Sequence, residues 1–175
     1  MKMPQFKIAI SEARIHRTVR RMARQLDVYY AAQAVSQITV VCVMNATFVF
    51  CADLVRCLKT PARIVFTRAR SYQGARKGKT RLSPIAESLR GRHVLVLDTI
   101  YDTGGTMARV LAAARRQTQH VTAAVLIVKT GKQSRPLPPE IRFIGMELPG
   151  DPFVIGYGLD YDGEFRELKE VRIFR

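Results

Sequence analysis

Five short strand-like runs alternate with helical patterns along the chain, and this alternation constrains the fold more than any other feature. The runs cover residues 38–44, 63–68, 93–97, 121–128 and 141–148. The first and fourth, ITVVCVM and VTAAVLIV, are almost entirely apolar, which suits strands that are covered on both faces. Strands separated by helices favour a parallel sheet, so the sequence predicts an α/β domain with a mostly parallel central sheet flanked by helices.

Three helices are predicted before and between these strands. Ser11 can cap the first helix, whose apolar residues recur with the period of an amphipathic helix. Those apolar residues are Ile15, Val19, Met22 and Leu26. The second helix begins near Thr47 and ends before Pro61, and the third covers about 104–116.

Length and composition are those of one ordinary globular domain. The chain has 175 residues, of which 47% are hydrophobic and 25% charged, so a sizeable core can form. The cysteines Cys42, Cys51 and Cys57 are odd in number and have no partner at metal-ligand spacing, so they are interpreted as reduced core thiols. Neither a signal peptide nor an apolar window of membrane-spanning length is present, and a cytoplasmic location is therefore predicted.

The charge balance is the most unusual global property. The sequence has 29 Lys+Arg against 14 Asp+Glu, a formal net charge of +15, which favours anionic partners such as phosphorylated metabolites, nucleic acid or acidic lipids. The first predicted helix carries five of these arginines: Arg14, Arg17, Arg20, Arg21 and Arg24. They form either a solvated charged face or an anion-binding surface, and the pattern alone does not decide. Residues 71–81 have the composition of an exposed cationic loop.

The stretch VLVLDTIYDTGGTM, residues 94–107, places polar residues directly after a predicted strand. Ligands of open parallel sheets bind beyond the carboxyl ends of strands, where Asp98, Asp102 and the TGGT sequence 103–106 follow. Glycines at a helix N-terminus suit a phosphate, and carboxylates beside it could hold a metal ion, bind sugar hydroxyls or transfer a proton. Alternatively, the aspartates only cap the helix and the glycines only shape the turn.

This stretch resembles the ribose-phosphate signature of type I phosphoribosyltransferases, and nearly the whole chain resembles their hypoxanthine-guanine branch. MNATFVFCADL (44–54) resembles the pyrophosphate loop and the helix after it, and RARSYQG (68–74) the entry to the mobile loop. FVIGYGLDYDGEFREL (153–168) resembles the purine site and hood. The resemblance implies one domain: a type I phosphoribosyltransferase-like core at about 28–148 and a small hood built from the N-terminal segment and about 149–175.

The resemblance also implies the roles of individual residues. Asp102 would be the general base near purine N7. The ribose and its 5′-phosphate would bind to Asp98, Thr99, Thr103, Gly104, Gly105 and Thr106. The purine would contact Lys129, Phe153 and Val154, and the pyrophosphate would contact Asn45, Ala46 and Arg166. Asp160 and Asp98 would hold Mg2+, and Ser71 and Tyr72 would begin a loop that closes over the site and excludes water.

Three of these assignments have an ordinary structural alternative. Phe153 could belong to the core, and Lys129 could be a solvated strand end. Asp160 and Arg166 could form a surface ion pair, which is worth under about 1 kcal/mol.

Several positions depart from the family pattern, mostly in the half of the site that would bind pyrophosphate and metal. Thr99 stands where a second acidic residue is usual, and Asn45 with Ala46 stands where Lys-Gly is typical. Gly105 replaces a lysine found in some members, and Gln133 an arginine found in some relatives. The presumed base, the phosphate loop and the purine contacts are retained.

Two functions remain open. The favoured one is a magnesium-dependent transferase that moves the phosphoribosyl group of phosphoribosyl pyrophosphate to N9 of hypoxanthine or guanine, giving IMP or GMP and pyrophosphate. The alternative is a weak or inactive paralogue that binds purine nucleotide and uses its basic surface on RNA or DNA. A homodimer or homotetramer is expected, and membrane association is not. The sequence does not decide which 6-oxopurine is preferred.

Overall fold

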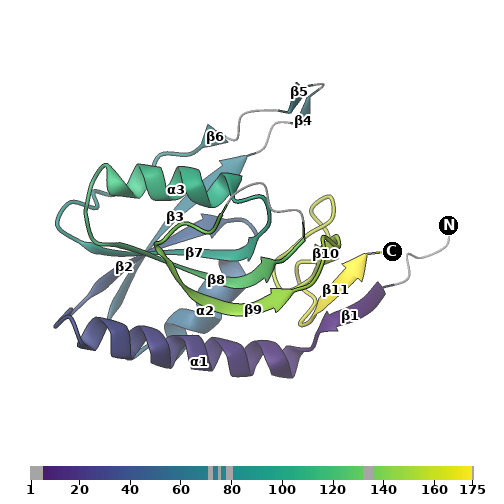
Figure 1. Ribbon diagram of the computed structural model, residues 1–175, viewed down its shortest axis with the longest axis horizontal. Helices are drawn as coiled ribbons and strands as arrows, with labels where there is room; N and C mark the ends of the chain where they lie inside the picture. Colours follow the sequence, from purple (N-terminus) through teal and green to yellow (C-terminus); the bar gives the residue numbers. More distant parts are fainter. Residues whose placement is uncertain (1–5, 71–72, 75, 78–80, 132–135, 175) are drawn as a thin grey trace.

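The computed structural model describes residues 6–70, 73–74, 76–77, 81–131 and 136–174 (Figure 1). Its main sheet has the strand order β6-β3-β2-β7-β8-β9. The strands of this sheet are β2 Ile38–Met44, β3 Ala62–Arg70, β6 Arg81–Leu82, β7 His93–Tyr101, β8 Val121–Lys129 and β9 Ile141–Leu148. All neighbours from β3 to β9 are parallel, and only β6 at the edge is antiparallel. The predicted α/β fold with a mostly parallel sheet is confirmed.

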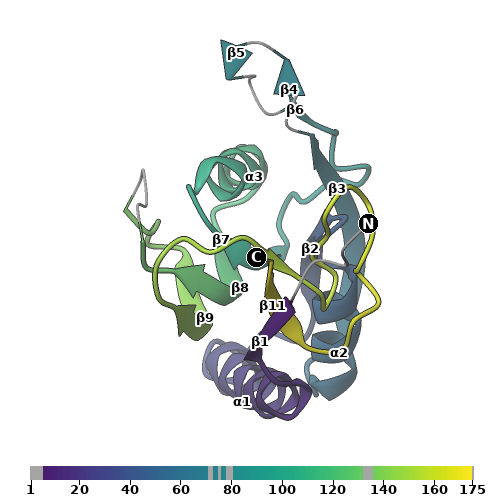
Figure 2. The same ribbon diagram turned by 90° about the vertical axis from the view of Figure 1, so that its right-hand side faces the viewer.

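Helices cover both faces of this sheet. They are α1 Glu12–Ala31, α2 Phe48–Cys57 and α3 Gly105–Arg115. α1 and α2 pack together on one face, and α3 lies on the other (Figures 1 and 2). Two apolar clusters, one on each side of the sheet, form the core, which explains why the central strands are apolar on both faces. No helix in the described part of the chain combines the length and apolarity that a membrane crossing requires.

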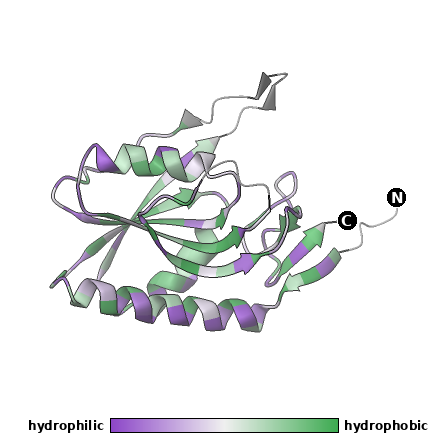
Figure 3. Cartoon of the chain, viewed as in Figure 1, coloured by the Kyte–Doolittle hydropathy of each residue, from purple (hydrophilic) through white to green (hydrophobic). Residues whose placement is uncertain are grey.

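The first helix forms as its sequence predicts. The Ser11 hydroxyl accepts a hydrogen bond from the backbone N–H of Arg14 at 3.4 Å, so the predicted N-cap is confirmed. Its apolar residues are buried against the main sheet, while the outward side is hydrophilic (Figure 3). The helix ends at Ala31, later than the apolar pattern indicated.

The third strand extends beyond the predicted end at Leu97 and reaches Tyr101. Parallel pairing with β8 continues through Asp98, Ile100 and Tyr101, which outweighs the low strand propensity of a buried aspartate. As a result the first carboxylate of the motif lies within the sheet and the second lies in the loop after it.

A second, three-stranded antiparallel sheet joins the two terminal segments. It has the order β1-β11-β10, with β1 Phe6–Ile10, β10 Val154–Ile155 and β11 Val171–Phe174. A further pair, β4 Gln73–Gly74 with β5 Arg76–Lys77, is also antiparallel. The division into a core at about 28–148 and a hood stays a prediction, and α1, most of which precedes residue 28, packs on the main sheet.

The three cysteines form no disulfide. Cys42 and Cys51 are buried thiols, whereas Cys57 is exposed at the end of α2. The interpretation of all three as core residues is therefore wrong for Cys57, because the last turn of an amphipathic helix turns this position toward solvent.

Candidate functional site

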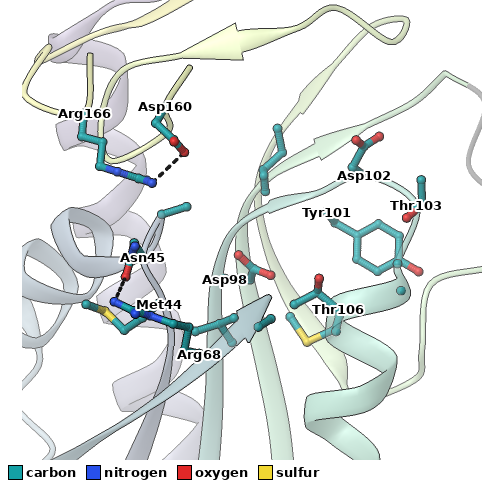
Figure 4. A pocket seen from close by; sticks show the side chains of 17 residues that line it. Met44, Asn45, Arg68, Asp98, Tyr101, Asp102, Thr103, Thr106, Asp160 and Arg166 are labelled. Atoms are coloured by element: carbon teal, nitrogen blue, oxygen red, sulfur yellow. Dashed lines mark hydrogen bonds and ion pairs between the residues drawn. The ribbon is translucent and has the colours of Figure 1, made fainter. Parts of the chain in front are cut away.

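A cleft of about 570 Å³ opens at the carboxyl ends of β2, β3 and β7 (Figure 4). The polar side chains that line it come from five segments: Asn45, Arg68, Asp98, Tyr101, Asp102, Thr103, Thr106, Asp160 and Arg166. Residues far apart in the sequence meet there because parallel strands deliver their ends to one edge of the sheet. The cleft therefore lies where the sequence predicted a ligand site.

The TGGT segment forms the turn into α3. Gly104 has a φ of +75°, and a Cβ at this position would lie 2.2 Å from the Tyr101 hydroxyl oxygen. Only glycine fits this turn without moving Tyr101, which is buried and donates to the Pro136 carbonyl at 3.1 Å. Thr103, Gly105 and Thr106 also line the cleft at the N-terminus of α3, where backbone N–H groups attract an anion.

Asp98 is a buried carboxylate at the floor of the cleft. Its side chain accepts a hydrogen bond from the Thr47 hydroxyl at 3.2 Å. Burial raises the pKa of Asp98 from 3.8 to about 7, because removal of the ionised form from water outweighs the hydrogen bonds that favour it. The Thr47 oxygen in turn accepts from the backbone N–H of Thr99 at 3.1 Å. Thr47 was not predicted as a site residue, because sequence spacing gives no sign of its contact with Asp98.

Thr99, which the sequence predicts at the ribose, is not among the residues that line the cleft. It is completely buried, and its hydroxyl donates to the backbone carbonyl of Ala46 at 3.1 Å. Successive residues of a strand point to opposite faces of the sheet, so the side chains of Asp98 and Thr99 point in different directions. Through this hydrogen bond, Thr99 connects β7 to the segment of Asn45 and Ala46.

The segment after β2 is held from a second side as well. Gly158 has a φ of +91°, and a Cβ there would lie 2.2 Å from the Ala46 carbonyl oxygen. Asn45 and Ala46 both line the cleft, and the Asn45 side-chain oxygen accepts from Arg68 at 2.9 Å. Arg68 also lines the cleft but was not predicted as a site residue. Its position at the end of the predicted strand 63–68 was the sequence feature that could have indicated it.

Lys129 stands between two carboxylates at the end of β8. Its ammonium nitrogen lies 3.3 Å from a carboxylate oxygen of Asp102 and 3.2 Å from one of Asp151. Lys129 is 7% exposed, which excludes the alternative of a solvated strand end. Asp151 was missed as a partner because the loop that carries it is far from Lys129 in sequence.

Two of the three residues predicted to hold the purine, Phe153 and Val154, lie in the segment after Asp151. Phe153 is 51% exposed and packs edge-to-face with Tyr161, with ring centroids 5.8 Å apart. The alternative of a core phenylalanine is therefore excluded. Val154 is buried and pairs with Ile173 in the small sheet.

Asp160 and Arg166 form an ion pair at the side of the cleft opposite Asp102 (Figure 4). Their nearest side-chain atoms are 2.8 Å apart, and Arg166 also donates to the Gly158 carbonyl at 2.6 Å. Ser71 and Tyr72, the predicted start of the mobile loop, and Gln133 lie outside the described residues.

The donor set of the cleft fits magnesium that shares its coordination with a substrate. Asp98 and Asp160 both line the cleft and offer carboxylate oxygens. The described residues contain no group of three or more metal-binding side chains that could hold an ion alone. Mg2+ commonly binds through one or two carboxylates, substrate phosphates and water, so two carboxylates are sufficient.

Comparison with known proteins places this geometry in a family. Residues 11–162 match the family model described as phosphoribosyl transferase domain. Hypoxanthine phosphoribosyltransferase of Haemophilus influenzae is 31% identical over 173 residues, which cover 96% of this chain and 94% of that protein. Human hypoxanthine-guanine phosphoribosyltransferase is 34% identical over 147 residues, covering 77% and 66% of the two chains.

Solved structures agree with this match. A hypoxanthine-guanine phosphoribosyltransferase from Bacillus anthracis has a TM-score of 0.86 and 26% identity, with 99% of this chain and 100% of that chain covered. Trypanosoma cruzi hypoxanthine phosphoribosyltransferase in complex with the product IMP has a TM-score of 0.86 and 27% identity, with 100% and 96% covered. The cleft, the sheet and these matches together show that the chain belongs to the phosphoribosyl transferase domain family.

Proposed function

We propose that the chain transfers the 5-phosphoribosyl group of phosphoribosyl pyrophosphate to N9 of a 6-oxopurine, hypoxanthine or guanine. The products are IMP or GMP and pyrophosphate. The observation that carries this proposal is the meeting of the TGGT loop, Asp102 and Lys129 at one edge of the sheet. Relatives of nearly equal length carry the name hypoxanthine phosphoribosyltransferase, which supports the same reaction.

The TGGT loop would orient the donor substrate. The backbone N–H groups at the start of α3 and the hydroxyls of Thr103 and Thr106 would bind the 5′-phosphate. Asp98, at the floor of the cleft, would accept hydrogen bonds from ribose hydroxyls. A bound phosphate and a buried carboxylate on either side of the ribose would fix the position of its C1′ atom.

Asp102 and Lys129 would act on the purine. N9 forms a bond to C1′ while the bond from C1′ to the pyrophosphate oxygen breaks and its electron pair leaves with pyrophosphate. The purine loses one proton, which Asp102 would accept at N7. The Lys129 ammonium has three N–H donors, so it can donate to the purine 6-oxo group while it still contacts Asp151. A 6-amino group offers no such acceptor, which would disfavour adenine.

Arg68, Arg166 and the segment of Asn45 and Ala46 would hold the leaving pyrophosphate. Both guanidinium groups line the cleft, and each is already oriented by a hydrogen bond to the protein. Arg68 thereby supplies positive charge at the segment that lacks the family's lysine. Magnesium, held by Asp160 and Asp98 together with the substrate, would neutralise phosphate charge when bound.

The alternative of an inactive, nucleotide-binding paralogue gains no support from the comparisons. A cytoplasmic location and a homodimer or homotetramer stay predictions. For Trypanosoma cruzi hypoxanthine phosphoribosyltransferase, the C-terminal region has been studied for its role in oligomeric state and activity.

A spectrophotometric assay with hypoxanthine or guanine, phosphoribosyl pyrophosphate and magnesium tests the proposal. We expect turnover in the native chain and a loss of about 10²- to 10⁴-fold in Asp102→Asn, which is the usual contribution of a general base. IMP should still bind the variant, because the phosphate loop is unchanged. Absence of turnover with either base in the native chain would overturn the proposal.

A further inference from the structure

A cluster of arginines lies on α1, away from the cleft. We call it the arginine face, and its members are Arg14, Arg17, Arg20, Arg21 and Arg24. At 100° per residue these positions fall within an arc of about 120° around the helix axis. They line a shallow depression of about 400 Å³ together with Thr18, and none of them lines the catalytic cleft. The face is therefore a separate feature of the molecule.

The charge of this face is not neutralised by the protein. Among the described residues, no carboxylate lies within 4.0 Å of any of its five guanidinium groups. Arg21 donates to the Gly145 carbonyl and to the Gln25 side chain, which are both uncharged. Like charges three and four residues apart destabilise a helix, so the ligand-free face is electrostatically unfavourable. An anion placed over the face would relieve this repulsion.

The positive surface continues from α1 to the edge of the main sheet. A second depression of about 600 Å³ shares Arg21 and Arg24 with the first and adds Arg142 of β9 beside three apolar side chains. The Arg142 guanidinium lies 5.8 Å from the centroid of the Tyr29 ring, a contact that orients it. An elongated basic surface suits an extended polyanion better than a single small phosphate.

The spacing of the arginines suits a nucleic-acid backbone. Arg14 and Arg24 are ten residues apart, which corresponds to about 15 Å along a helix. One strand of a duplex carries a phosphate about every 3.4 Å of its axis, so about four phosphates lie within this length. Guanidinium groups bind phosphate oxygens in a bidentate manner.

The lining of the face favours a duplex over single strands. Single-strand binding sites use exposed aromatic rings on which bases stack. The depression between the arginines contains no aromatic side chain, and Phe143 in the adjoining one is 8% exposed. We propose that the arginine face binds the phosphate backbone of a double-stranded nucleic acid independently of its sequence, while the catalytic cleft stays open.

The test is equilibrium binding of the full chain to labelled RNA and DNA duplexes, followed by fluorescence anisotropy at several salt concentrations. For about four neutralised phosphates, the slope of log K against log salt should be about −3.6. The Arg17→Gln/Arg20→Gln/Arg24→Gln variant should reduce the magnitude of this slope by about 2.7 and weaken binding at least about tenfold at low salt. Comparison of the dissociation constants for the two duplexes shows whether the face binds RNA or DNA more tightly.

The matched control is Arg56→Gln/Arg90→Gln/Arg116→Gln. These three arginines are exposed, lie outside the face, and their replacement removes the same net charge. The proposal requires the control to bind duplex within about twofold of the native chain and saturating phosphoribosyl pyrophosphate not to compete. Equal weakening in both triple variants, no duplex binding at low salt, or a preference for single strands or anionic lipid vesicles would overturn it. Unchanged transferase turnover in both variants would show that they are folded.

Discussion

Replacement of Asp98 by asparagine should stabilise the ligand-free protein at neutral and alkaline pH. Burial raises the pKa of Asp98 from 3.8 to about 7, so the folded state favours the protonated carboxyl group. The stability that this protonation contributes is complete below pH 3.8 and is lost as the pH rises toward 7. At 1.36 kcal/mol per pKa unit, ionised Asp98 costs the folded state about 4 kcal/mol. Asparagine is neutral at every pH and can still accept the hydrogen bond from Thr47.

The advantage of Asp98→Asn should therefore grow with pH. Between about pH 5 and about pH 8 it should increase by about 2.5 kcal/mol, because up to about pH 7 folded Asp98 still holds the proton that the unfolded chain has released. For a chain of this size the change corresponds to a relative increase in Tm of about 5–10 °C. The same substitution should weaken the binding of phosphoribosyl pyrophosphate, because a neutral amide replaces a carboxylate that would accept from ribose hydroxyls.

Thermal unfolding followed by circular dichroism, without magnesium or phosphate, measures this effect. The native chain and Asp98→Asn are compared across the pH range, with Glu167→Gln as the control because Glu167 is exposed. The control should follow the native chain at each pH. A difference in Tm between Asp98→Asn and the native chain that stays constant with pH would refute the argument that burial penalises the charged carboxylate.

Three further predictions concern the walls of the cleft. Gly104→Ala should lower stability by about 1–3 kcal/mol and raise the KM for phosphoribosyl pyrophosphate, since its Cβ would clash with Tyr101. Gly91→Ala is its control in thermal and kinetic assays, because Gly91 has a φ of +67° but open space around it and should leave KM unchanged. Asp151→Asn should raise the KM for hypoxanthine several-fold at nearly constant kcat, because Lys129 loses one of its orienting carboxylates; an equal loss in kcat would contradict a positioning role. Arg68→Gln should raise the KM for phosphoribosyl pyrophosphate but not that for hypoxanthine in steady-state assays, and equal effects on both would count against a pyrophosphate contact.

Much of the fold follows from patterns that are local in the sequence. The predicted strands at 38–44 and 141–148 coincide with β2 and β9, since runs of apolar residues bounded by turn residues are short-range signals. The end of β7 was predicted too early, because its extension depends on pairing with β8 and not on its own residues. The small sheet of β1, β10 and β11 was not predicted strand by strand, since its strands are short and β1 pairs with β11 across nearly the whole chain.

Sequence patterns alone identified the chemical groups at the ligand-binding edge: the TGGT turn, Asp98, Asp102 and Lys129 lie at or directly after the carboxyl ends of strands that neighbour each other in a parallel sheet. The contacts that these groups make with other side chains depend on the folded chain. It turned Thr99 toward Ala46, placed Arg68 against Asn45, and brought Asp151 to Lys129. These contacts depend on side-chain direction and on burial, which arise when distant segments pack together. The raised pKa of Asp98 has the same origin, because only the folded chain removes its carboxylate from water.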